Sequence, residues 1–221
     1  MSTNAKVATI FTGVLILAVI VVIVIVAGQR PPTPTPSANP ETSLPATVRA
    51  DTHILDAAAD GEVTLVEFLD FECEACGAFY PFVEQLREEY AGKVTFAFRY
   101  FPLPGHGNSV NAAVAVEAAA RQDMLGPMFD RLFTTQAEWG EKGEVSQAPL
   151  FRQYAEELGL DLERYDSDVS DPDVLARVQS DFDDGVALGV DRTPSFFLND
   201  RLLELSSFED LRAAIEEELA K

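Results

Sequence analysis

Cys73 and Cys76 are the only cysteines of the 221-residue chain, and two residues separate them. This C-x-x-C spacing suits thiol–disulfide exchange, in which one sulfur attacks and the other resolves the mixed disulfide. A purely structural disulfide is a weaker interpretation, because so short a loop restrains the unfolded chain by only about 2 kcal/mol. A metal site would need two more ligands, and the histidines His53 and His106 have no metal-binding spacing. We therefore predict a redox-active disulfide, with no metal and no other cofactor.

The sequence around the two cysteines indicates the elements that position them. Residues 63–71 are mostly apolar and rich in β-forming residues, which predicts a buried strand ending just before Cys73. A helical pattern follows as far as Gly92, so Cys73 lies at the start of a helix. The unpaired N–H groups and the dipole at this end of a helix favour a thiolate, which makes Cys73 the predicted nucleophile.

The rest of the pattern predicts an α/β domain. Residues 94–101 form a second strand, and the order strand, helix, strand implies a parallel pair. An Ala-rich helix follows, with Asn108 or Ser109 as its cap. The later elements are a mainly helical stretch to about Leu188, a hairpin of 195–198 and 201–205 around Asn199-Asp200, and a final helix capped by Ser207.

Residues 7–27 form an uncharged run rich in Val, Ile and Leu. A helix of this length spans about 31 Å, close to the roughly 30 Å hydrocarbon core of a bilayer, so we predict a transmembrane anchor. The alternative is a signal peptide with a weak cleavage site after Ala27, although such apolar regions are normally about 7–15 residues long. Residues 28–50 are rich in Pro and Thr and are expected to form an extended linker.

The chain carries 37 acidic and 16 basic residues, a net charge of −21. The predicted domain at 51–221 holds 36 of the acidic and 13 of the basic residues, so its net charge is −23. This charge argues against binding to nucleic acid and weakens attraction to anionic lipid headgroups. The chain is 47% hydrophobic, which excludes a wholly disordered protein.

Three stretches resemble the DsbA-like branch of the thioredoxin superfamily. They are FLDFECEACGAFYP around the cysteines, FRYFPLPGHGNSVNAAVAVEAAARQ in the middle, and GVDRTPSFFLNDRLL near the end. The resemblance covers most of residues 60–220. It implies a thioredoxin fold interrupted by a helical insertion, which we place at about 105–188.

The resemblance also implies roles for residues outside the cysteine pair. Thr193 and Pro194 match a loop whose cis-proline faces the C-x-x-C, where the neighbouring backbone pairs with an extended substrate peptide. Glu67 matches a buried acid that moves protons to and from Cys76. An outward-facing or edge carboxylate is the alternative for Glu67, and His106 is expected to be an ordinary loop histidine outside the site.

The active-site flank Glu74-Ala75, between the cysteines, departs from the pattern of the family. This departure affects the expected redox strength. The carboxylate of Glu74, together with those of Asp70 and Glu72, is expected to oppose a thiolate at Cys73. Such opposition would shift the potential toward the reducing side. The oxidising strength of the family is therefore not carried over to this chain.

These features together predict a membrane-tethered thiol–disulfide oxidoreductase that forms disulfides in exported proteins. The domain is expected outside the cytoplasm, where disulfides persist, so that residues 1–6 are cytoplasmic and the protein crosses the cell membrane once. The expected partners are exported proteins or peptides with cysteines, and a membrane redox partner that reoxidises the pair. A reductase or isomerase of the same fold is the first alternative, favoured by Thr193 and the acidic flank. A non-redox peptide-binding module is the second.

Overall fold

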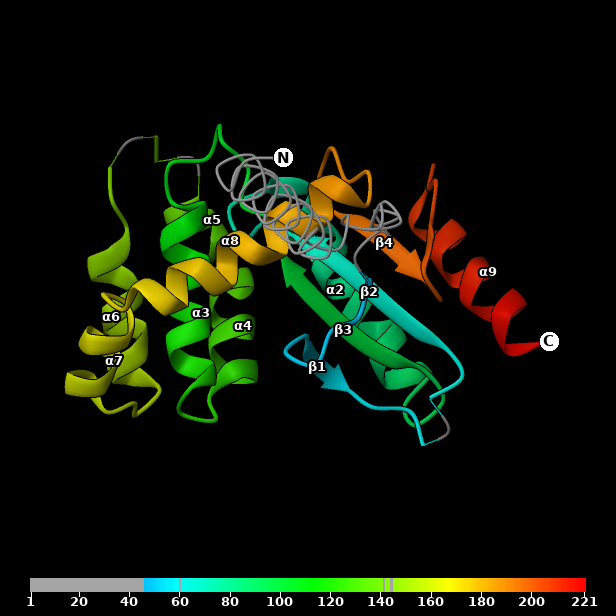
Figure 1. Cartoon of the computed structure of the whole chain (residues 1–221), viewed down its shortest axis with the longest axis horizontal. Coiled ribbons are helices and arrows are strands. Elements are labelled where there is room, and N and C mark those ends of the chain that lie inside the picture. The colour runs from blue at the N-terminus through cyan, green and yellow to red at the C-terminus, as the bar shows by residue number, and fades with distance from the viewer. Residues whose placement is uncertain (1–45, 60, 141, 144) are drawn as a thin grey trace, which may run out of the picture. The chain divides into compact units, whose positions relative to one another are not determined.

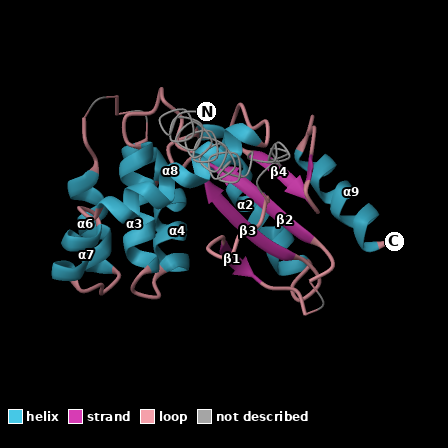
Figure 2. Cartoon of the chain, in the orientation of Figure 1, coloured by secondary structure: helices cyan, strands magenta, loops and turns pink. Residues whose placement is uncertain are grey.

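The computed structural model describes residues 46–59, 61–140, 142–143 and 145–221 (Figure 1). The strands are β1 (His53–Asp56), β2 (Thr64–Leu69), β3 (Thr95–Tyr100), β4 (Ser195–Leu198) and β5 (Arg201–Leu202). The helices are α2 (Glu74–Glu89), α3 (Ser109–Ala120), α4 (Leu125–Thr134), α5 (Gln136–Trp139), α6 (Ala148–Glu157), α7 (Leu162–Asp168), α8 (Pro172–Ala187) and α9 (Phe208–Leu219) (Figure 2). The predicted anchor at 7–27 and most of the predicted linker lie outside the described residues. Within those residues, no helix is long and apolar enough to cross a membrane.

β2 is the central strand of a sheet whose order is β1-β3-β2-β4-β5. It pairs in parallel with β3, as the strand–helix–strand pattern predicted, and antiparallel with β4. β4 and β5 form the predicted hairpin. The turn residues Asn199 and Asp200 both have positive φ, a conformation that these residue types tolerate well. β1, a short edge strand that pairs antiparallel with β3, is absent from the elements predicted from the sequence.

Different helices cover the two faces of the sheet. Side chains alternate along β2, so that Leu65 packs with residues of α2 and α9. The next residue, Val66, belongs to the opposite face, where Phe182 of α8 packs. The last helix, α9, begins with the predicted cap, in which Ser207 and Asp210 form a reciprocal capping box.

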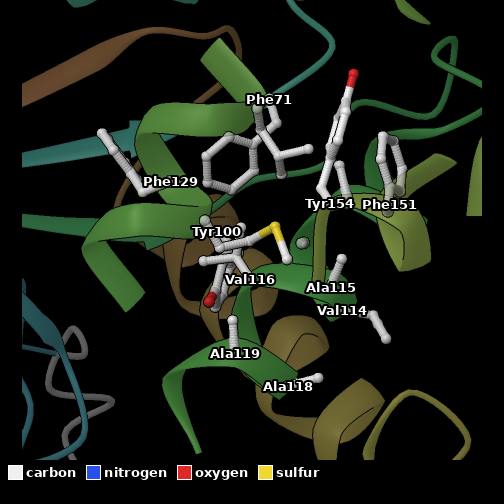
Figure 3. Packing of buried hydrophobic residues seen from close by; sticks show 14 of the residues in the cluster. Phe71, Tyr100, Val114, Ala115, Val116, Ala118, Ala119, Phe129, Phe151 and Tyr154 are labelled. Carbon is white, nitrogen blue, oxygen red and sulfur yellow. The ribbon is translucent and has the colours of Figure 1, made fainter. Parts of the chain in front are cut away.

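The helices from α3 to α8 follow β3 and precede β4 in the chain, and they correspond to the predicted insertion, which lies to one side of the sheet in Figure 1. α3 is central among them, because it contacts α4, α6, α7 and α8. Its alanines are buried on almost every side, and small side chains let these helices approach closely. Phe71, from the segment leading to the cysteines, packs edge-on against Phe129 of α4 with ring centroids 5.5 Å apart (Figure 3). The insertion is thereby packed against the sheet near the cysteines.

Asn108 takes the predicted N-cap position of α3 but does not cap the helix through its side chain. Its Nδ2 donates to the Val145 carbonyl oxygen at 3.1 Å, and its Oδ1 accepts from the Gln147 amide at 2.7 Å. The side chain therefore fixes the start of α3 to the segment before α6.

The last residues of the predicted linker belong to the folded domain. Arg49 forms an ion pair with Asp181 of α8 at 2.9 Å. Arg99 of β3 donates to the Ala46 carbonyl oxygen at 3.1 Å. The packed domain therefore begins before residue 51, the predicted boundary.

Candidate active site

Cys73 and Cys76 lie where the chain passes from β2 into α2, as predicted. Cys73 is the N-cap residue of α2, and Glu74 is the first residue of the helix. Both cysteines are buried free thiols, whereas Glu74 and Ala75 between them are exposed. The Cys73 sulfur therefore lies at the helix end where backbone amides are unpaired.

The loop before β4 brings Thr193 and Pro194 against Cys73. β4 pairs with β2 so that Ser195 lies opposite Phe68, which places the preceding loop beside the end of β2. The Thr193–Pro194 peptide bond is cis, as the resemblance implied. The Cys73 thiol donates a hydrogen bond to the Thr193 carbonyl oxygen at 3.4 Å. The structure thus unites two predicted site segments that lie 120 residues apart in the sequence.

The two thiols differ strongly in acidity. A hydrogen bond from the Cys76 thiol lowers the pKa of Cys73 to about 6, and the backbone amides of Cys76 and Ala75 act in the same direction. Burial raises the pKa of Cys76 well above its ordinary value, and the charge of Glu67 adds to this effect. Near neutral pH, Cys73 is therefore a thiolate and Cys76 a thiol, which is the division of roles that thiol–disulfide exchange needs.

Glu67 lies in the centre of the sheet, on the face that α2 covers. It is 7% exposed, and it stands opposite Phe98 of β3 and Phe196 of β4. Burial raises the pKa of this carboxyl to about 8, and the charge of Cys73 contributes in the same direction. The alternative of an edge or outward-facing carboxylate is therefore wrong, because β2 has a neighbour on each side.

Two of the three carboxylates that were expected to oppose a thiolate are buried, and both accept hydrogen bonds. Asp70 accepts from the Glu72 amide at 2.9 Å and from the Ser109 hydroxyl at 2.6 Å. Glu72 accepts from the Asn108 amide at 2.6 Å. The pKa of Cys73 is lowered in spite of these carboxylates, so the groups that favour its thiolate outweigh any opposition from them.

His106 lies in the site, although it was expected to be an ordinary loop histidine outside it. Its Nδ1 is 2.6 Å from Asp70 Oδ2, and the same oxygen accepts from the Leu103 amide at 2.9 Å. These bonds attach the loop after β3 to a residue three positions before Cys73. No local pattern points to this pairing, because 36 residues separate the histidine from its carboxylate.

Gln136 of α5 is a second site residue that was not predicted from the sequence. Its Nε2 donates to the carbonyl oxygens of Phe71 and Cys73, both at 2.8 Å. Gly77 leaves room for this side chain, because a Cβ at that position would collide with the Gln136 amide. The helical insertion thereby holds the turn that carries Cys73.

A cavity of about 290 Å³ lies beside the cis-proline. Its lining includes the apolar side chains of Phe79, Pro194 and Leu203 and the charged side chains of Arg192 and Glu204. Among the residues that the structure describes, including the site, no group of His, Cys, Asp and Glu side chains is arranged to hold a metal ion.

Comparisons with known proteins agree with this architecture. A family model described as thioredoxin matches residues 50–217. A thioredoxin-like oxidoreductase from Silicibacter pomeroyi DSS-3 is 26% identical, with a TM-score of 0.65 over 78% of this chain and 95% of that one. BdbD from Bacillus subtilis, in its oxidised form, is 23% identical, with a TM-score of 0.66 over 77% of this chain and 94% of that one. At 23% identity, this second likeness shows the fold alone.

Curated relatives by sequence are longer proteins. The Na⁺/H⁺ antiporter NhaA of Herminiimonas arsenicoxydans is 38% identical over 144 residues, which are 65% of this chain and 22% of the antiporter. Na⁺/H⁺ antiporter NhaA 3 of Salinispora tropica is 38% identical over 143 residues, 64% of this chain and 21% of that protein. The chain thus spans about a fifth of the length of these relatives.

Proposed function

Because the chain belongs to the thioredoxin family, we propose that it is a thiol–disulfide oxidoreductase whose Cys73–Cys76 pair forms disulfides in exported proteins. The observation that carries this proposal is the division of acidity within the pair. The pKa of Cys73 is lowered to about 6 at the start of α2, whereas burial raises that of Cys76. The likeness to the oxidoreductase of Silicibacter pomeroyi supports the same class of reaction.

The reaction begins with the oxidised pair. A substrate thiolate attacks the Cys73 sulfur, the Cys73–Cys76 bond breaks, and Cys76 takes up a proton as it leaves. Glu67 is suited to supply this proton, because its pKa of about 8 keeps it protonated at neutral pH. The substrate's second thiolate then attacks the substrate sulfur bound to Cys73 and releases Cys73 as a thiolate. Two electrons pass from the substrate thiols to the pair, and of the two protons that these thiols lose, one restores Glu67 and the other goes to the solvent.

The substrate peptide is proposed to lie beside the cis-proline. The cavity there combines the apolar surface of Phe79 and Leu203 with backbone next to Pro194. An extended peptide can pair with such backbone through main-chain hydrogen bonds, as in strand addition. The Thr193 carbonyl oxygen is 3.4 Å from the Cys73 sulfur, so a peptide bound here would have its cysteine within reach.

The acidity of Cys73 favours oxidation of the substrate over its reduction. A stabilised thiolate stabilises the reduced pair, and the disulfide becomes a stronger oxidant. The pKa of about 6 lies between those of about 7 in thioredoxin and about 3.5 in DsbA. We therefore place the potential between their values, about −270 and about −120 mV. A reductase or isomerase is the competing proposal, and the measured potential separates the two.

The domain is proposed to lie outside the cytoplasm, on a protein that crosses the cell membrane once. This proposal rests on the uncharged run at 7–27 and the Pro-rich stretch that follows it. A membrane redox partner would then take two electrons from the reduced pair. In intact cells, a thiol reagent that does not cross membranes should label Cys73 after mild reduction. Labelling only after cell lysis would contradict this topology.

The assignment is tested with the full-length protein and a reduced, unfolded substrate. Cys73→Ser should abolish disulfide formation, because the sulfur that the substrate attacks is absent. In the reductive direction, Cys76→Ala should accumulate a mixed disulfide at Cys73, because no second sulfur resolves it. Non-reducing gels detect this species. A Cys73→Ser protein that still oxidises the substrate would overturn the proposal.

A further inference from the structure

Both histidines of the chain bind a carboxylate, but one of the two pairs adjoins the cysteines. His53 lies 2.6 Å from Glu117, and His106 lies 2.6 Å from Asp70. The backbone carbonyl of Asp70 also accepts a hydrogen bond from the Cys73 amide at 3.1 Å. The second pair is therefore built into the turn that carries the reactive sulfur.

Asp70 holds the His106 imidazole in a fixed place. The carboxyl is buried, and it accepts hydrogen bonds from the Glu72 and Leu103 amides and from the Ser109 hydroxyl as well as from His106. These donors fix the carboxyl in place against the imidazole, and the hydrogen bond to Asp70 favours the protonated form of His106. The His106 side chain is 24% exposed, so its charge is only partly screened by water.

The groups around His106 raise its pKa. Burial lowers the pKa of His106, but the hydrogen bond to Asp70 and the charges of Asp70, Cys73 and Glu72 outweigh it and raise the pKa. The interaction between His106 and Cys73 is reciprocal, because an imidazolium that is favoured by a thiolate also favours that thiolate. Glu67 opposes a negative charge at Cys73 from the sheet. The residues between the cysteines, Glu74-Ala75, supply no cation.

We infer that His106 is a positioning residue for thiol–disulfide exchange, whose imidazolium, held by Asp70, stabilises the Cys73 thiolate from the loop after β3. The catalytic meaning of this charge rests on the proposed function, because a stabilised Cys73 thiolate is a better leaving group when the substrate disulfide forms. Its electrostatic effect on the thiol does not depend on any substrate.

The test is the acidity of Cys73 in the reduced, full-length protein. A unit charge near a partly buried thiol, at an effective dielectric constant of about 20 and with partial screening, changes the thiol pKa by on the order of one pH unit. His106→Gln should therefore raise the pKa of Cys73 by about one pH unit. The rate of alkylation by iodoacetamide should fall about tenfold at pH 5 and hardly change at pH 8, where the thiolate forms in both proteins.

Two further variants separate charge from packing. His106→Lys keeps a cation and should retain the low pKa of Cys73, whereas His53→Gln removes the other imidazole–carboxylate pair and should leave Cys73 unchanged. An unchanged alkylation profile in a folded His106→Gln protein, with only lower thermal stability, would overturn the inference. A purely structural role predicts that result.

Reciprocity provides a second measurement if His106→Gln fails to fold. Removal of the thiolate in Cys73→Ala should lower the pKa of His106, read from its imidazole NMR signals, by the same amount. The His53 signals serve as an internal control. An unshifted His106 would contradict the inference. Neither measurement involves turnover, so an inactive protein with these shifts would overturn the proposed function and leave the role of His106 in place.

Discussion

Glu67 is a carboxyl group at the centre of a sheet, between two aromatic neighbours. Burial of this kind disfavours the charged form and raises the pKa, here to about 8. The group is therefore protonated at neutral pH, which an exposed glutamate is not. A proton held on the sheet face below α2 suits the needs of Cys76, which must gain a proton when it leaves as a thiol.

Glu67→Gln should flatten the pH dependence of stability. The folded pKa of about 8 exceeds the ordinary value of 4.5, so the neutral carboxyl contributes its full stability below about pH 4.5. That stability is lost as the pH rises through about 8. In the oxidised protein, where neither cysteine titrates and burial still raises the pKa, the wild type should lose up to about 1.4 kcal/mol per pH unit in this window. Glutamine cannot ionise, so the variant should lose less stability over this range, and the remaining loss comes from other groups with a raised pKa, such as His106.

Urea unfolding of the oxidised proteins at pH 5 and pH 8 measures this difference. The exposed flank residue provides a matched control, because Glu74→Gln should keep the slope of the wild type. A Glu67→Gln protein that loses as much stability as the wild type between the two values would show that Glu67 is not the titrating group.

Among single residues, sequence patterns predicted those whose chemistry depends on their neighbours in the chain. The spacing of Cys73 and Cys76 and their place between a strand and a helix are local features. The Asp70–His106 pair was missed because its partners meet only through the packing of the loop after β3. The bonds of Asp70 to His106 and of Glu72 to Asn108 were missed for the same reason, since 36 residues separate the partners in each case.

The turn between β2 and α2 is held by an element from the insertion. Gln136 of α5 bonds to the carbonyl oxygens of Phe71 and Cys73, and Gly77 of α2 leaves the space that its side chain needs. Glycine inside a helix costs about 0.5–1 kcal/mol relative to alanine. Gly77 therefore lowers the helix propensity of α2, but it leaves room for the two hydrogen bonds of Gln136 that hold the turn.

The effect of Gly77→Ala on the free energy of unfolding should change sign with the residue at position 136. In the wild type, the new Cβ displaces the Gln136 amide, and the loss of two hydrogen bonds exceeds the gain in helix propensity, for a net loss of about 1 kcal/mol. In a Gln136→Ala protein, no bond is left to break, so the same substitution should add about 0.5–1 kcal/mol. A double-mutant cycle by urea unfolding measures both effects. Destabilisation of equal size in both backgrounds would contradict this account of the turn.

Most elements follow from periodicity in the sequence. The strands at β2 and β3, the hairpin of β4 and β5 and the capped α9 each have a clear local pattern. β1 lacks one, because His53–Asp56 is a four-residue strand that remains partly exposed along its length. Its place in the sheet comes from pairing with Ala97 and Phe98 of β3, which no local pattern encodes.

Some of the domain's many acidic residues are paired with arginines inside the fold. Arg99 is fully buried, and it donates to Asp181 and Asp184 of α8 at 2.6 Å each. Arg49 reaches the same two carboxylates from the N-terminal segment. This network ties the start of the domain, the sheet and α8 together. Composition indicated the net charge but not where the arginines lie, because the network joins three distant segments.

The central claim, that Cys73 and Cys76 form an oxidising redox pair, is tested most directly by the equilibrium of the full-length protein with glutathione. Trapping the thiols by alkylation at a series of glutathione ratios yields the midpoint potential of the pair. A single two-electron transition between about −270 and about −120 mV is the predicted result, because the acidity of Cys73 lies between those of thioredoxin and DsbA. A midpoint at or below about −270 mV, or thiols that do not respond to glutathione, would contradict it.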